Sequence, residues 1–164
     1  MHPIVKTVGG LSASLPSDRT IRLTRNFKAP RQLVWDAHTQ PHLLKRWLLG
    51  PPGWTMPVCE VDLRVGGRYR YEWRNVDGAR TMALSGTYRI VDAPETLADT
   101  QVFDDNWTDG EAETRITLSE QDGDTNMVFE ITYASQQVRD MALSMPMMDG
   151  MEAGYARLEA SVHA

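Results

Sequence analysis

The chain has 164 residues, 41% of them hydrophobic, and a formal net charge of −5. A chain of this length buries roughly 70% of its unfolded surface, enough for one domain with its own core. Its basic residues are scattered, apart from Arg64, Arg68 and Arg70, which argues against the clustered cationic surface that nucleic acid requires. No apolar run approaches the ~18 residues of a membrane span. We therefore expect neither nucleic acid nor a membrane as a partner.

Two further features favour a cytoplasmic protein. Cys59 is the single cysteine, so no intramolecular disulfide can form, which suits a reducing compartment. The first residues lack the basic stretch and the continuous apolar run of a signal peptide.

Residues 1–19 are rich in small and turn residues, including Gly9-Gly10, and we expect them to be an N-terminal extension to a domain over residues 20–164. The run Ile4–Val8 is a candidate edge strand or an arm onto a second copy of the chain. The alternative is a tail lying on the surface. Since a free edge strand can pair with another copy, the sequence predicts a homodimer.

From residue 20 the apolar residues become periodic. Ile21, Leu23, Arg25 and Phe27 alternate with polar residues, which predicts a strand with these four side chains on one face. Helical spacing then predicts two short helices, the second over residues 41–49.

Further strands and helices follow between turn signals. Strands are expected over residues 54–63, 68–74, 81–91, 96–103, 113–120 and 126–134, and helices over 136–143 and 148–162. Asp77-Gly78 and Asp122-Gly123 predict hairpin turns. This order indicates an α+β fold, in which an antiparallel sheet has one long helix available to fill its concave side.

A glycine pair stands directly before a strand in which Tyr69, Tyr71 and Trp73 share one face. A phosphate-binding loop would need a following helix, whereas an aromatic strand follows here. Glycine permits bulges and positive φ at little steric cost. We therefore interpret Gly66 and Gly67 as a structural corner between two strands.

Metal and nucleophilic chemistry find little support in the sequence. His38 and His42 are the only close histidines, but Pro41 interrupts their helical spacing, and we interpret them as surface residues. Cys59 has no histidine near it in sequence, which favours a small buried hydrophobe over a nucleophile. We predict no catalytic residue, no metal and no cofactor.

The run CEVDLRVGGRYRYEWRNVDG resembles the activator-of-heat-shock-protein-90-ATPase homologue-like family, within the START/SRPBCC superfamily. Three further runs support the resemblance in the same order: FKAPRQLVWDAHTQPHLLKRWLLGPPGWT, LSGTYRIVDAPETL and RDMALSMPMMDGMEAGYARLE. The resemblance covers roughly residues 20–162. It implies a helix-grip fold, in which about seven antiparallel strands wrap around a long C-terminal helix. Two short helices follow the first strand, and a cavity lies between sheet and helix.

Characterised relatives include co-chaperone domains, carriers of lipids and hormones, and aromatase/cyclase enzymes. The resemblance therefore implies that this chain binds a small hydrophobic or aromatic ligand in the cavity. One alternative is a co-chaperone-like interaction module, with a chaperone or another protein as partner and a role in the stress response. Another is an enzyme of the cyclase or hydratase type. A fold does not decide among these functions.

Aromatic residues and methionines are the candidates for lining such a cavity. Methionine is flexible and suits an adaptable apolar surface, and tyrosine hydroxyls supply the few polar points that an apolar site uses. The alternative is that the same side chains simply fill a core. The candidates are Trp47, Tyr69, Tyr71, Trp73, Met82, Leu84, Tyr88, Phe103, Phe129, Tyr133, Met145, Met148, Met151 and Tyr155.

Overall fold

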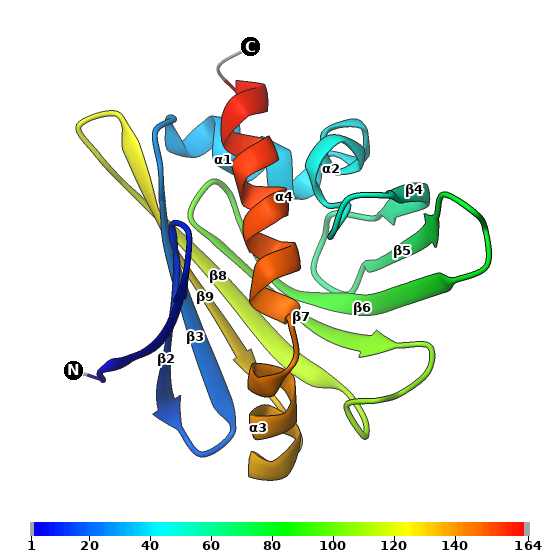
Figure 1. Ribbon diagram of the computed structural model, residues 1–164. Helices are drawn as coiled ribbons and strands as arrows, with labels where there is room; N and C mark the ends of the chain where they lie inside the picture. The colour runs from blue at the N-terminus through cyan, green and yellow to red at the C-terminus, as the bar shows by residue number, and fades with distance from the viewer. Residues whose placement is uncertain (1, 163–164) are drawn as a thin grey trace.

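The computed structural model describes residues 2–162, which form one antiparallel sheet and four helices (Figure 1). The strands are β1 (Ile4–Val8), β2 (Leu11–Ser17), β3 (Thr20–Phe27), β4 (Trp54–Val61), β5 (Arg68–Asn75), β6 (Thr81–Asp92), β7 (Thr96–Phe103), β8 (Ala112–Gln121) and β9 (Asp124–Thr132). The helices are α1 (Arg31–Thr39), α2 (Pro41–Trp47), α3 (Gln136–Ser144) and α4 (Met147–Val162). The strand order is β1-β2-β3-β9-β8-β7-β6-β5-β4.

This arrangement confirms the expected α+β fold. Helix α4 crosses one face of the sheet, called the inner face below, and α1 and α2 lie near its C-terminal end (Figure 1). The sheet has nine strands instead of about seven. None of the helices within residues 2–162 is long and apolar enough to span a membrane.

The two additional strands come from the N-terminal residues. Strands β1 and β2 form a hairpin, and β2 pairs with β3, so the boundary expected after residue 19 falls inside the sheet. Leu11 and Ala13 on β2 are fully buried. Strand β1 is one edge of the sheet and exposes Ile4 and Val5. Pairing of two copies along this edge stays a prediction.

The turn between β4 and β5 is built around Gly66 and Gly67. Gly66 has a φ of +84°, and a Cβ on Gly67 would overlap the carbonyl oxygen of Asp62, so both positions require glycine. The Gly66 N–H donates to the Tyr88 carbonyl, and the Tyr88 N–H donates to the Gly67 carbonyl, both at 2.9 Å. The structure confirms the corner and shows that it also fixes the backbone of Tyr88.

The hairpin turn predicted at Asp122-Gly123 is confirmed as well, and a serine caps α3. Asp122 and Gly123 have φ values of +54° and +83° and form the two-residue turn between β8 and β9. Ser135 caps α3, because its side chain accepts the N–H of Val138 at 3.2 Å.

The pairing register carries one continuous apolar row across the inner face. Leu23 on β3 lies opposite Phe129 on β9, which lies opposite Ile116 on β8, which in turn lies opposite Leu97 on β7. Side chains at directly opposed positions share a face of the sheet. The period-two pattern in the sequence therefore decides which residues meet beneath α4.

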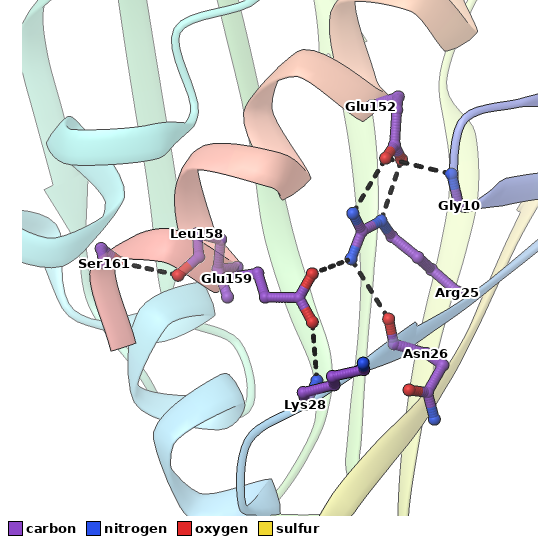
Figure 2. Close-up of polar contacts among 8 residues, drawn as sticks. All are labelled: Gly10, Arg25, Asn26, Lys28, Glu152, Leu158, Glu159 and Ser161. Atoms are coloured by element: carbon purple, nitrogen blue, oxygen red, sulfur yellow. Dashed lines mark hydrogen bonds and ion pairs between the residues drawn. The ribbon is translucent and has the colours of Figure 1, made fainter. Parts of the chain in front are cut away.

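A charged residue, Arg25, also lies on this face, as its spacing from Leu23 and Phe27 predicts. Its side chain is only 6% exposed. The guanidinium donates to the Glu152 carboxylate on α4 through Nε at 2.9 Å and Nη2 at 2.8 Å, and Nη1 lies 3.4 Å from Glu159 (Figure 2). This arrangement joins the middle of β3 to two turns of α4.

The same two carboxylates also accept backbone N–H groups. Glu152 accepts from Gly10, in the turn between β1 and β2, at 3.2 Å, and Glu159 accepts from Lys28 at 2.8 Å (Figure 2). The N-terminal hairpin is thereby tied to α4 as well as to β3. We call Arg25, Glu152 and Glu159 the helix clamp.

Replacing Arg25 by alanine should lower the free energy of unfolding by about 3–5 kcal/mol, because it leaves largely buried carboxylates without their counter-charge. Arg22→Ala on the same strand is the matched control. Arg22 pairs with Glu130 at 3.0 Å, but the two side chains are 35% and 30% exposed, so its loss should cost less than about 1 kcal/mol. Urea denaturation measures both losses, and equal losses would contradict the role of the clamp.

Candidate functional site

A group of tyrosines surrounds a carboxylate on the inner face of β5, β6 and β7. Tyr69 and Tyr71 lie two residues apart on β5, and Tyr88 on β6 lies directly opposite Asp99 on β7. The ring centroid of Tyr69 is 5.0 Å from that of Tyr71 and 5.3 Å from that of Tyr88. We call these four residues the tyrosine–aspartate cluster.

The position of the Tyr69 ring depends on a glycine in the neighbouring strand. Gly86 lies opposite Tyr69, and a Cβ on it would lie 2.6 Å from the Tyr69 hydroxyl and overlap the carbonyl oxygen of Thr100. Any other residue at this position would displace the ring. Because Gly86 leaves this space open, the Tyr69 hydroxyl reaches β7.

Asp99 is buried and only partly compensated. The Tyr69 hydroxyl lies 2.8 Å from Oδ1 of Asp99 and 2.8 Å from the Thr100 carbonyl, and it donates to these acceptors. Burial raises the pKa of Asp99 to about 6, although hydrogen bonds from Tyr69 and Thr114 act in the opposite direction. Among residues 2–162, no lysine or arginine forms an ion pair with this carboxylate.

The Tyr88 hydroxyl is the second unusual group of the cluster. The side chain is 1% exposed, and its oxygen has no hydrogen-bond partner in the described part of the chain. Burial raises its pKa, and the nearby Asp99 adds to the effect. The Tyr71 side chain acts in the opposite direction and lowers this pKa as a hydrogen-bond donor would, although the two hydroxyls lie outside hydrogen-bond geometry. A buried hydroxyl without a partner is rare in folded proteins and calls for an explanation.

A second aromatic group lies between α1, α2 and α4. Trp47 stacks on Tyr155 with 5.5 Å between centroids, and Tyr155 meets Phe27 edge-on at 5.6 Å. His38 lies 5.0 Å from Trp47 and is buried, so the interpretation of His38 as a surface residue is wrong. Its Nδ1 bonds the Val34 carbonyl at 2.8 Å, and packing from α2 and α4 covers the ring.

The surroundings of His38 and Cys59 do not favour a catalytic role for either residue. Burial lowers the pKa of His38 to about 4, so the ring is neutral at physiological pH. Burial raises the pKa of Cys59 to about 11, with Lys45 acting against it, so the thiol is a poor nucleophile at neutral pH. Within residues 2–162, no three His, Cys, Asp or Glu side chains are grouped so that they could hold a metal ion.

The structure divides the candidate residues among the core, its margin and the surface. Phe103, Phe129 and Met151 are partly buried against the core, whereas Met82 and Met145 are exposed. The remaining candidates are buried: Trp47, Tyr69, Tyr71, Trp73, Leu84, Tyr88, Tyr133, Met148 and Tyr155. Trp73 lies between the tyrosine–aspartate cluster and the aromatic group around Trp47: its ring is 5.9 Å from that of Tyr71, and its Nε1 donates to the Leu48 carbonyl at 2.7 Å.

Two hollows lie on the other side of the sheet, the outer face. The larger has a volume of about 390 Å³ and is lined mainly by polar and charged residues such as Arg89, Glu113, Arg115 and Glu130, and Asp99 also contributes to its lining. The smaller, of about 190 Å³, lies over β4, β5 and β6. Sites for apolar ligands are lined mainly by hydrophobic side chains, so neither hollow matches the cavity expected from the sequence.

Sequence reasoning did not single out Asp99, although the signal was present. Phe103 is one of the residues expected to line the cavity, and a period of two from Phe103 along the same strand reaches Gln101 and then Asp99. A carboxylate at an inward position of a strand is uncommon, because burial of a charge is costly. The same test separates Asp99 from carboxylates in turns and at outward positions of the strands.

Asp99 should make the stability of the protein depend on pH. Its carboxyl titrates near 3.8 when unfolded and near 6 when folded, so the folded state binds the proton more tightly. The free energy of unfolding therefore falls as the pH rises from about 4 to about 6. Asp99→Asn removes the charge and keeps an acceptor for Tyr69. Above pH 6 the variant should be more stable than the wild type by up to about 3 kcal/mol.

Denaturation of both proteins across pH 4–8 measures this difference. His38 acts in the opposite direction, because its lowered pKa removes stability as the pH falls from about 6.5 to about 4. Both proteins carry His38, so subtracting their values at each pH isolates Asp99. A gain that stays constant across this range would show that the pKa of Asp99 is ordinary.

Comparison with known proteins agrees with the fold described above. A crystal structure of a protein from Rhodobacter sphaeroides is 28% identical, with a TM-score of 0.87 over 93% of this chain and 98% of that one. A protein from Mycobacterium smegmatis is 27% identical, with a TM-score of 0.79 over 98% and 97% of the two chains. One from Chromobacterium violaceum is also 27% identical, with a TM-score of 0.77 over 90% and 99%.

No curated protein matches the chain by sequence. The family described as activator of Hsp90 ATPase homolog 1-like protein matches residues 28–163, and the solved structures share its START/SRPBCC-type fold. The chain belongs to the activator of Hsp90 ATPase homolog 1-like family.

Proposed function

We propose that the protein binds a small, largely apolar molecule between the inner face of the sheet and α4. The polar group of this ligand lies against the tyrosine–aspartate cluster. The observation that carries the proposal is the buried Tyr88 hydroxyl, which has no hydrogen-bond partner within residues 2–162 and lies opposite Asp99, which has no ionic partner there.

These two groups cost the folded protein stability. A buried donor or acceptor without a partner costs about 1–3 kcal/mol, and phenylalanine at position 88 would avoid that cost. A buried carboxyl with a raised pKa costs more at neutral pH. Unpaired polar groups of this kind gather at binding and active sites. A ligand atom within hydrogen-bond reach would satisfy both groups at once.

Methionines supply the room that a ligand needs. Met148 and Met151 on α4 pack into and against the core, and Met147 beside them receives the Tyr133 hydroxyl at 3.8 Å. Methionine fills irregular spaces and repacks at low cost. Met145, between α3 and α4, is 40% exposed. In our proposal the ligand enters on this side of the methionines. The ligand thus enters by displacing flexible side chains beside a rigid sheet.

The co-chaperone-like alternative gains less support from the surface. An interaction module would present a contiguous apolar patch. The most exposed large apolar residues near β5 are Val65, in the corner before the strand, and Val76, in the turn after it. Eight residues of strand separate them by roughly 26 Å, so the two do not form one patch.

An acid–base enzyme is the second candidate, and one observation favours it. A pKa of about 6 gives Asp99 both protonation states near neutral pH, as a general acid or base requires. In that case the tyrosines would position a substrate beside Asp99. Conversion of a bound compound would appear as a product mass that is absent with Asp99→Asn.

Replacing Tyr88 by phenylalanine tests the proposal against a purely structural role. Because the hydroxyl has no partner, its removal should raise the free energy of unfolding by about 1 kcal/mol or leave it unchanged. Tyr69→Phe is the matched control: it removes a hydroxyl that serves two acceptors, and should cost about 1–3 kcal/mol. Urea denaturation gives both values.

Native mass spectrometry of freshly purified protein supplies the binding measurement. We expect an added small-molecule mass on the wild type that is weaker on Tyr88→Phe, and enhanced fluorescence of the neutral apolar dye N-phenyl-1-naphthylamine. The proposal fails if the wild type shows neither added mass nor dye binding while Tyr88→Phe is as destabilising as Tyr69→Phe.

A further inference from the structure

Aromatic rings lie in a row beside Asp99 in the tyrosine–aspartate cluster. The face of an aromatic ring attracts a positive charge within about 6 Å of its centroid. Tyr69 lies 5.0 Å from Tyr71 and 5.3 Å from Tyr88, and Trp73 continues the row at 5.9 Å from Tyr71. A positive group beside Asp99 would lie next to Tyr69, which bonds this carboxylate, and Tyr88, which lies opposite it.

The carboxylate of Asp99 supplies a negative charge to the same space. One of its oxygens accepts the Tyr69 hydroxyl, and no lysine or arginine of residues 2–162 pairs with it. The helix clamp shows the usual alternative, because there Arg25 forms ion pairs with Glu152 and Glu159. A buried carboxylate is stabilised by an opposite charge nearby. At Asp99 the protein itself does not provide that charge.

The Tyr88 oxygen adds a free acceptor to this negative environment. It is buried and unpaired, and its residue lies directly across from Asp99. A hydroxyl oxygen can accept two hydrogen bonds, so an N–H group placed between Tyr88 and Asp99 can donate to both. A carboxylate or phosphate in this position would instead be repelled by Asp99.

We propose that the interior site takes a small organic cation, a protonated amine on an apolar body, with its ammonium group between Asp99 and Tyr88. This inference rests on the proposed function, because it names the class of ligand for that same site. The apolar body lies against the rings and the methionines of α4, and the ammonium supplies the charge that the cluster lacks.

Three probes of similar shape and different charge test the inference. They are 2-phenylethylamine as the cation, 2-phenylethanol as the neutral analogue and 3-phenylpropionate as the anion. Isothermal titration calorimetry of the full chain at pH 7.5 measures each affinity. We expect the amine to bind about tenfold or more tightly than the alcohol, because a hydrogen bond to a charged group adds to the shared apolar contact. The anion should bind most weakly.

Two carboxylate variants locate the preference. Asp99→Asn should abolish the advantage of the amine and leave the affinity for the alcohol within about threefold of the wild type. Glu113→Gln is the matched control, because Glu113 lies on the adjacent strand β8 and is exposed, one residue from Thr114, the residue opposite Asp99, so its side chain is on the outer face. It removes the same charge from the protein and should leave the advantage intact. Thermal melts of both variants verify that they are folded.

The outcomes separate this inference from the proposed function. If the alcohol binds as tightly as the amine, or the anion binds best, the cation inference is overturned and small-molecule binding stands. The cation inference is also overturned if Glu113→Gln removes the advantage as fully as Asp99→Asn, because the effect then belongs to net charge. If none of the probes binds at millimolar concentration, the cation inference falls, and the dye and mass measurements decide the proposed function by themselves.

Discussion

The ion pairs of Arg25 with Glu152 and Glu159 fix where α4 lies on the sheet. A helix packed through apolar side chains alone can slide or rotate at modest cost, whereas a bidentate guanidinium–carboxylate contact has one geometry. Glu152 and Glu159 are seven residues apart, so the clamp grips α4 at two turns on one side. The hairpin β1–β2 joins the same clamp through Gly10. This attachment fixes which side of α4 faces β3 and the β1–β2 turn.

The buried carboxylates of the helix clamp have a cationic partner, whereas the buried carboxylate of the tyrosine–aspartate cluster has none within residues 2–162. Around Arg25 each carboxylate has the guanidinium and a backbone N–H as partners, so burial is compensated. At the cluster Asp99 has neutral hydroxyl donors and Tyr88 has no hydrogen-bond partner within residues 2–162. Proteins lose stability at sites that serve function and recover it elsewhere. The ion pairs of the helix clamp can therefore offset the stability that the protein loses at Tyr88 and Asp99.

Much of the fold could be predicted because its determinants are local. The period of two on β3 and β5, the glycine corner and the Asp-Gly turn between β8 and β9 each depend on a few neighbouring residues, and each is confirmed. The same period even placed Arg25 on the inner face. Its partners were not predictable, because Glu152 lies 127 residues away and reaches Arg25 only after the sheet and α4 have formed.

The residue types of the candidate site could be predicted from the sequence. Which of these residues lie together in space was harder to predict. Tyr69, Tyr71 and Tyr88 are brought together by the register of β5 and β6, as alternation suggests. The separation of Trp47 and Tyr155 into a second group depends on how α2 docks on α4, which no local pattern specifies. His38 was misplaced for the same reason. The sequence of α1 does not show that α2 and α4 cover His38.

The polar contacts of α4 described here reach β3, the β1–β2 turn and α2. Towards α2, Gly154 lets the Trp47 backbone approach closely, and Arg157 donates to the Gly50 carbonyl at 2.9 Å. These contacts hold the middle and the C-terminal part of the helix. Its first turn instead brings Met147 and Met148 to the core, where the contacts are mostly apolar and the weak bond from the Tyr133 hydroxyl to Met147 is the polar one described. A rigidly held helix with a pliable first turn can therefore admit a ligand at one end while the sheet and the clamp stay in place.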